Sequence, residues 1–135
     1  MRSKRALGTV IRNIAIVLII CALIIPQRTD MDFVEVGRVT FVYGEKEIHT
    51  MLSEDDLQEI IEMFDNKVLF RDSPACGFSE SVSIQLNESE VLCLACDGHS
   101  LVYWKNKDRY FKVSSKDIVR LHELLSEYGF SFPCV

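Results

Sequence analysis

The sequence predicts an α+β protein, in which an N-terminal membrane-anchor helix is followed by one domain with an antiparallel sheet and two helices packed on one face. Three observations support this prediction. The first 28 residues combine basic residues with an uninterrupted apolar run. Several short runs are rich in β-branched and aromatic residues and are separated by turn residues. Two longer segments begin with a serine and repeat apolar residues at helical spacing.

The N-terminal segment has the layout of a membrane-targeting sequence. Four basic residues, Arg2, Lys4, Arg5 and Arg12, precede an uncharged apolar run from 14 to 25 that ends at Pro26. No A-x-A-like cleavage site follows the run, so we expect residues 7–25 to remain as a single-pass anchor. The alternative is a signal segment that is removed. We therefore divide the chain into a membrane anchor or signal segment, residues 1–28, and an extracytoplasmic domain, residues 30–135.

Charge is distributed unevenly between these two parts. The first 29 residues hold five basic and no acidic residues, whereas the remainder holds ten basic and all 20 acidic residues. By the positive-inside tendency, we expect the N-terminus in the cytoplasm and the C-terminal domain outside the cell membrane. The net negative charge of the domain argues against a nucleic-acid partner, because such binding depends on Lys and Arg side chains that neutralise phosphates.

The first half of the domain is predicted as a hairpin followed by a helix. Residues 36–43 and 47–51 are two strand-like runs that flank a turn at 44–46. Ser53 is a good N-cap and is followed by three acidic residues that suit the positive end of a helix dipole. Apolar residues then recur on one helical face, at Leu57, Ile60, Ile61 and Phe64.

The second half is predicted as further strands and a second helix. Residues 67–71 form a short strand, and 72–77 form a loop because Pro and Gly interrupt regular structure. Strand 81–86 alternates apolar and polar residues, whereas 91–96 is apolar on both faces and should be central in the sheet. Residues 101–104 and 109–113 form a hairpin. A helix capped by Ser114 then runs to about Tyr128, and the apolar tail after it should pack on the domain.

The cysteines outside the anchor suggest a disulfide. In a small exported domain we expect a bond within the set Cys76, Cys96 and Cys134, with Cys93 in the core. A zinc site at Cys93, Cys96 and His99 is the weaker alternative, because no second C-x-x-C or H-x-x-x-H accompanies them. Buried free thiols are the third alternative. Asp97-Gly98 is an ordinary turn dipeptide, and no catalytic motif is present, so we predict no catalytic residue and no cofactor.

The predicted hairpin at 101–113 carries the best candidates for binding a partner. Aromatic side chains flank a cluster of basic ones there, and Trp104, Lys105, Lys107 and Arg109 could contact an anionic or sugar ligand. A simpler interpretation is that the aromatic residues enter the core while the basic residues keep the turn solvated. We predict a membrane-tethered extracytoplasmic binding or interaction module, with an envelope protein or glycan as partner. The alternative is a thiol- or zinc-dependent envelope enzyme that uses the Cys93, Cys96 and His99 region.

Three short stretches resemble those of small exported or membrane-anchored proteins of Gram-positive bacteria whose function is unknown. They are residues 74–78, 94–98 and 128–134, with sequences PACGF, LACDG and YGFSFPC. The resemblance spans about residues 36–135 and brings no functional residues. It implies a location at the cell envelope and a structural role for the cysteines.

Overall fold

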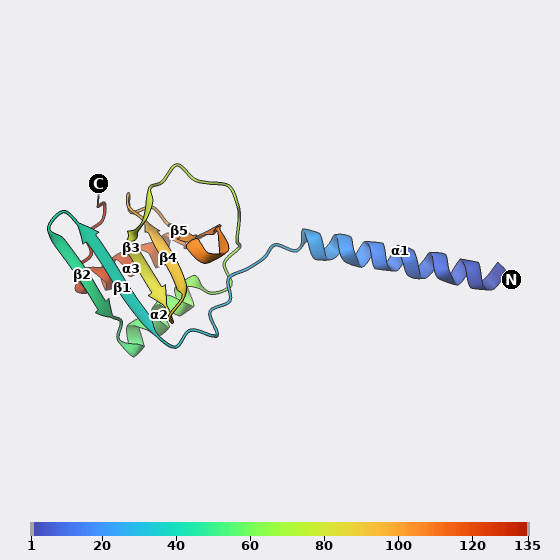
Figure 1. The fold of residues 1–135 in the computed structure, drawn as a ribbon, viewed down its shortest axis with the longest axis horizontal. Coiled ribbons are helices and arrows are strands. Elements are labelled where there is room, and N and C mark those ends of the chain that lie inside the picture. Colours follow the sequence, from blue (N-terminus) through green and yellow to red (C-terminus); the bar gives the residue numbers. More distant parts are fainter. Residues whose placement is uncertain (1, 135) are drawn as a thin grey trace.

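The computed structural model describes residues 2–134, apart from the side chains of residues 2–6 and 24. Helix α1 (Arg2–Ile24) projects away from the domain, which consists of one sheet with helices on one side (Figure 1). Within the described residues, no helix has the length and apolar character needed to cross a membrane.

The sheet confirms the predicted α+β class. It is six-stranded and antiparallel, with the order β2-β1-β3-β4-β5-β6. The strands are β1 (Gly37–Tyr43), β2 (Lys46–Met51), β3 (Phe78–Leu86), β4 (Glu90–Ala95), β5 (Leu101–Trp104) and β6 (Arg109–Lys112). A short 3₁₀ turn, η1 (Lys105–Lys107), joins the last two. Strand β4 lies between β3 and β5, so its apolar character on both faces agrees with the predicted central position.

Both domain helices begin at the predicted serine caps. The Ser53 hydroxyl accepts from the Asp56 N–H at the start of α2 (Glu54–Phe64), and Ser114 accepts from the Asp117 N–H at the start of α3 (Ser115–Glu127). These contacts satisfy N–H groups that have no partner within the helix. A bidentate ion pair between Arg120 and Glu59 joins the two helices.

The core lies between the helices and one face of the sheet (Figure 1). Successive side chains of a strand point to opposite faces of the sheet, so every second strand residue faces the core. These residues are Val39, Phe41, Val82, Ile84, Leu86, Leu92, Leu94, Val102, Trp104 and Phe111. The helices contribute Leu57, Ile60, Met63, Phe64, Leu121, Leu124 and Leu125. The tail packs as predicted, since Phe130 and Cys134 are buried.

One predicted strand is wrong. Residues 67–71 form two isolated bridges, Val68 with Arg28 and Phe70 with Tyr110. The segment pairs at one point with the chain that follows α1 and at another with β6, so neither ladder extends. Strand β3 begins at Phe78, earlier than predicted, and its pairing with β4 is irregular between Phe78 and Ser83. The alternating pattern does not indicate this start, because an irregularity shifts the parity of the strand.

The chain between α1 and the domain is held firmly. The Thr29 hydroxyl donates to the Phe64 carbonyl at 2.6 Å and accepts from the Lys67 N–H at 2.7 Å. The Leu69 N–H also donates to the Gln27 carbonyl at 2.8 Å. Only residues 25 and 26 therefore separate the end of α1 from chain that is bonded to the domain.

A hydrogen-bonded group joins the start of α2 to the end of α3. The Asp56 carboxylate accepts from the Ser53 hydroxyl at 2.6 Å and from the Tyr128 hydroxyl at 2.5 Å. The Tyr128 oxygen in turn accepts from the Ser53 N–H at 2.9 Å. The bonds from Ser53 and Tyr128 hold the pKa of Asp56 below its usual value, because both favour the charged carboxylate.

We expect Tyr128→Phe to lower the free energy of unfolding by about 1 kcal/mol at pH 7, because it removes a hydrogen bond to a charged group. A carboxylate whose pKa is depressed in the folded state stabilises the fold above its unfolded pKa, and this contribution is lost as the pH falls through the folded pKa. The difference between variant and wild type should therefore shrink below about pH 4. Urea unfolding at pH 7 and pH 3 measures it, with Tyr43→Phe at an exposed position as the control. An equal loss at both pH values would contradict the proposed role of Asp56.

Candidate functional site

The face of the sheet opposite α2 and α3, here called the open face, has a shallow pocket over β3 to β6. Its volume is about 530 Å³. Three aromatic side chains line it, from Phe78, Tyr103 and Tyr110, and Cys93 lies at its floor. Tyr103 and Tyr110 face each other across β5 and β6, and they reach the open face because Trp104 and Phe111 point into the core.

The aromatic rings pack against one another. The rings of Tyr103 and Tyr110 stack with their centroids 4.8 Å apart, and the Phe78 ring lies 5.5 Å from that of Tyr110. Phe70 stacks on Tyr110 from the segment that flanks β6, at 5.9 Å. All four side chains remain partly exposed. This arrangement gives an apolar surface that is already ordered without a ligand.

Polar groups border the aromatic surface. The Lys105 ammonium group contacts the Glu80 carboxylate at 2.5 Å, and both side chains line the pocket. The Tyr103 hydroxyl donates to the Asp108 carboxylate at 3.1 Å. Partial burial, followed by that bond, raises the pKa of Tyr103, so the phenol is neutral at physiological pH. The pocket thus combines stacked rings with one acid and one base.

The structure separates the four residues that the sequence suggested for binding. Trp104 is buried in the core, where its indole N–H donates to the Glu90 carboxylate, so its ring is not available to a partner. Lys107 lies over that ring, with its nitrogen 3.6 Å from the centroid. Arg109 donates to the carbonyls of Lys107 and Asp108. Of the four, only Lys105 lines the open-face pocket.

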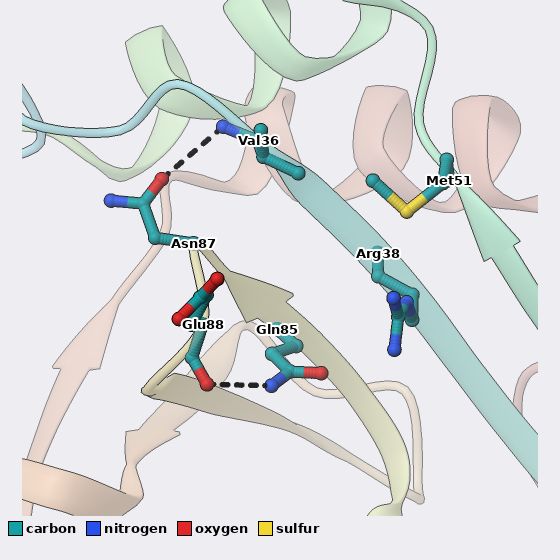
Figure 2. Close-up of a pocket in the computed structure, with 6 residues that line it drawn as sticks. All are labelled: Val36, Arg38, Met51, Gln85, Asn87 and Glu88. Carbon is teal, nitrogen blue, oxygen red and sulfur yellow. Dashed lines mark hydrogen bonds between the residues drawn. The ribbon is translucent and has the colours of Figure 1, made fainter.

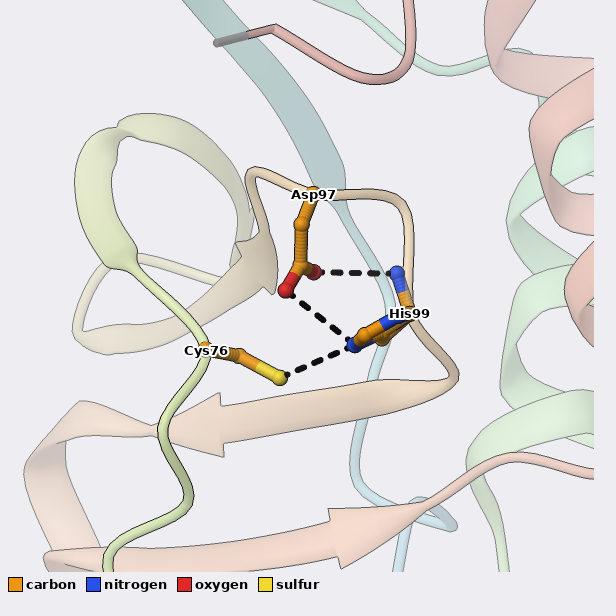
Figure 3. Close-up of side chains that lie close together, drawn as sticks. All are labelled: Cys76, Asp97 and His99. Atoms are coloured by element: carbon orange, nitrogen blue, oxygen red, sulfur yellow. Dashed lines mark hydrogen bonds and ion pairs between the residues drawn. The ribbon is translucent and has the colours of Figure 1, made fainter.

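A second group of chemically active side chains lies at the end of the loop before β3. The Cys76 sulfur is 3.3 Å from Nδ1 of His99, and the same nitrogen is 3.1 Å from Oδ2 of Asp97 (Figure 3). The His99 side chain is 69% exposed. No sequence pattern joins His99 to Cys76, which lies 23 residues earlier in an irregular loop.

This group does not have the geometry of a nucleophilic triad. Such a triad needs the nucleophile at one ring nitrogen and the carboxylate at the other, so that the imidazole can transfer a proton between them. Here both groups face Nδ1. Partial burial and the hydrogen bond to Asp97 raise the pKa of Cys76, which keeps the thiol protonated and lowers its reactivity.

The other cysteines do not belong to this group. All five in the described part of the chain are free thiols, so the predicted disulfide is not formed. Cys93 is buried, and desolvation by burial raises the pKa of its thiol to about 11. The Cys96 carbonyl accepts from the Cys134 N–H at 2.8 Å and from the Cys134 thiol at 3.2 Å. Within the described residues, the potential metal ligands that converge are Cys76, Asp97 and His99, rather than Cys93, Cys96 and His99.

A smaller pocket lies at the other end of the open face. It has a volume of about 230 Å³ and is lined by Val36, Arg38, Met51, Gln85, Asn87 and Glu88 (Figure 2). Two of its polar side chains serve the fold: the Asn87 amide oxygen accepts from the Val36 N–H, and Gln85 donates to the Glu88 carbonyl. These bonds fix the start of β1 and the turn after β3.

Comparison of the chain with protein-family models, with curated proteins and with solved structures finds no match.

Proposed function

We propose that residues 30–135 form a membrane-tethered extracytoplasmic binding module, and that its ligand contacts the open-face pocket. The observation that carries this proposal is the cluster of partly exposed rings, Phe78, Tyr103 and Tyr110, on a sheet face that neither α2 nor α3 covers. Ligand sites are concave and lined by aromatic groups, with a few polar groups that fix orientation. The Lys105–Glu80 pair supplies such groups at the pocket border.

A glycan is the ligand class that this surface fits best. One face of a pyranose ring carries C–H groups, which pack on aromatic rings, while its hydroxyl groups need both donors and acceptors. The rings of Tyr103 and Tyr110 offer the first kind of contact, and Lys105 and Glu80 offer the second. The pocket is open and shallow, which suits a segment of a longer chain better than an enclosed small molecule.

The membrane tether is supported by charge and by the short connection after α1. The basic N-terminal residues and the acidic domain agree with an inside N-terminus and an outside domain. Because Gln27 and Thr29 already bond to the domain, only residues 25 and 26 would separate it from the end of α1. A tether of two residues spans about 7 Å, so the domain would sit directly at the membrane surface.

Co-sedimentation of the detergent-solubilised full chain with purified envelope glycan of the host tests the proposed ligand. We expect Tyr103→Ala and Tyr110→Ala each to weaken binding about tenfold, equivalent to about 1.4 kcal/mol, because each removes stacking area. Tyr43→Ala, at an exposed position outside the pocket, is the matched control and should bind like the wild type. Absence of binding by the wild type, or equal binding by folded pocket variants, would reject the glycan ligand.

A further inference from the structure

We propose that Cys76, Asp97 and His99 bind a zinc-class divalent metal ion that fastens the loop before β3 to the turn after β4. This proposal is independent of the ligand of the open-face pocket. It differs from the predicted zinc set, because Cys93 and Cys96 are replaced by Cys76 and Asp97.

The spacing of the three donor atoms suits a tetrahedral ion. Sulfur, Nδ1 and a carboxylate oxygen all lie within 4.8 Å of one another. Nδ1 is 3.3 Å from the sulfur and 3.1 Å from Oδ2 of Asp97 (Figure 3). With metal–ligand bonds of about 2.0–2.3 Å, neighbouring ligands of tetrahedral zinc are about 3.3–3.6 Å apart. The two separations from Nδ1 are within a few tenths of an ångström of these values, and the separation of the sulfur from the carboxylate is at most 4.8 Å.

A metal ion can take the place of the hydrogen bonds within this group. Nδ1 of His99 faces both the Cys76 sulfur and the Asp97 carboxylate. Because a metal ion accepts one lone pair from each of the three groups, it would bond to all three at once. The thiol proton passes to solvent when the ion binds.

The backbone holds the ligands in place before any ion binds. The Cys96 N–H donates to the Gly77 carbonyl at 3.0 Å, which joins the loop to the turn beside both sets of ligands. Oδ1 of Asp97 accepts from the His99 N–H at 3.1 Å, so Oδ2 is left to face the ring. Gly98 has a φ of 77°, a conformation that favours glycine, and this lets the turn bring Asp97 and His99 together. Such supporting bonds orient metal ligands.

The donor set selects the metal and its role. A thiolate and an imidazole favour zinc and similar transition metals over calcium or magnesium, which prefer oxygen ligands. The exposed His99 leaves room for a water molecule as the fourth ligand. Because Phe78 follows Cys76 by two residues and packs on Tyr110, the ion would also fix one wall of the open-face pocket.

Metal titration of the reduced full chain in detergent tests the proposal. Co²⁺ should bind with one-to-one stoichiometry and give a thiolate-to-metal charge-transfer band, and Zn²⁺ should displace it. We expect Cys76→Ser and His99→Ala to weaken Zn²⁺ binding at least tenfold and to abolish the band or shift it. Zn²⁺ should also raise the thermal midpoint of the wild type but not of either variant.

Two control variants make the outcome specific. His49→Ala removes another exposed histidine that contacts a carboxylate, Glu47 at 2.9 Å, and it should bind the metal like the wild type. Cys93→Ser should also retain binding. Loss of binding in Cys93→Ser with full binding in Cys76→Ser would overturn the proposed ligand set, and absence of stoichiometric binding by the wild type would overturn the site itself.

Discussion

Replacement of Trp104 by alanine is expected to lower the free energy of unfolding by about 3–5 kcal/mol. Trp104 is fully buried and is among the largest such side chains in the domain. The substitution would leave a cavity between sheet and helices, and it would also remove the donor that satisfies the Glu90 carboxylate. The loss of stability should therefore exceed that caused by truncating a smaller, purely apolar side chain.

Chemical denaturation at pH 7 measures this effect. Val119→Ala, on the exposed side of α3, serves as the control and should change the free energy of unfolding by less than about 0.5 kcal/mol. Trp104→Phe should fall between the two, because it restores part of the buried volume. A loss below about 1 kcal/mol for Trp104→Ala would show that this side chain is not in the core.

Oxidation is expected to join Cys96 and Cys134 and to raise the stability of the domain by about 2–4 kcal/mol. The structure brings these two residues together, since Cys134 donates to the Cys96 carbonyl through both its backbone N–H and its thiol. The bond would close a long loop that contains β5, β6 and α3. Burial raises the pKa of Cys134 to about 11, so exchange should be slow at pH 7 and faster at alkaline pH.

Peptide mapping without reduction, after equilibration with oxidised glutathione, identifies the bonded pair. The expected product is the Cys96–Cys134 disulfide, in which two thiols lose two protons and two electrons as glutathione disulfide is reduced. Cys134→Ser should abolish the bond and the gain in thermal midpoint. A bond from Cys76 to either residue, or two free thiols after prolonged oxidation at pH 9, would contradict this pairing.

The regular elements of the fold could be predicted because each carries a local signal. Ser53 and Ser114 mark helix starts by capping chemistry, and the alternation in β3 and in the β5–β6 hairpin indicates which side chains face the core. The composition of segment 67–71 predicts a strand, but composition does not reveal that its two contacts have different partners.

The candidate sites were harder to predict, because they depend on contacts between distant segments. The strand-like hairpin suggested aromatic binding residues, but only the parity of the strands decides that Tyr103 is on the open face while Trp104 is buried. Phe78 joins the pocket after an irregular stretch of β3. Cys76 reaches His99 from a loop with no repeating pattern, so sequence spacing could not indicate the pair.

Protease treatment of intact protoplasts tests the proposed topology most directly. The chain carries an epitope after its last residue and is produced in its host, with a cytoplasmic protein as the internal control. The proposal predicts that external protease removes the epitope while the cytoplasmic control stays intact, and that the untreated chain fractionates with membranes. Protection of the epitope until the cells are lysed, or recovery of the chain in the soluble fraction, would contradict a domain tethered outside the membrane by α1.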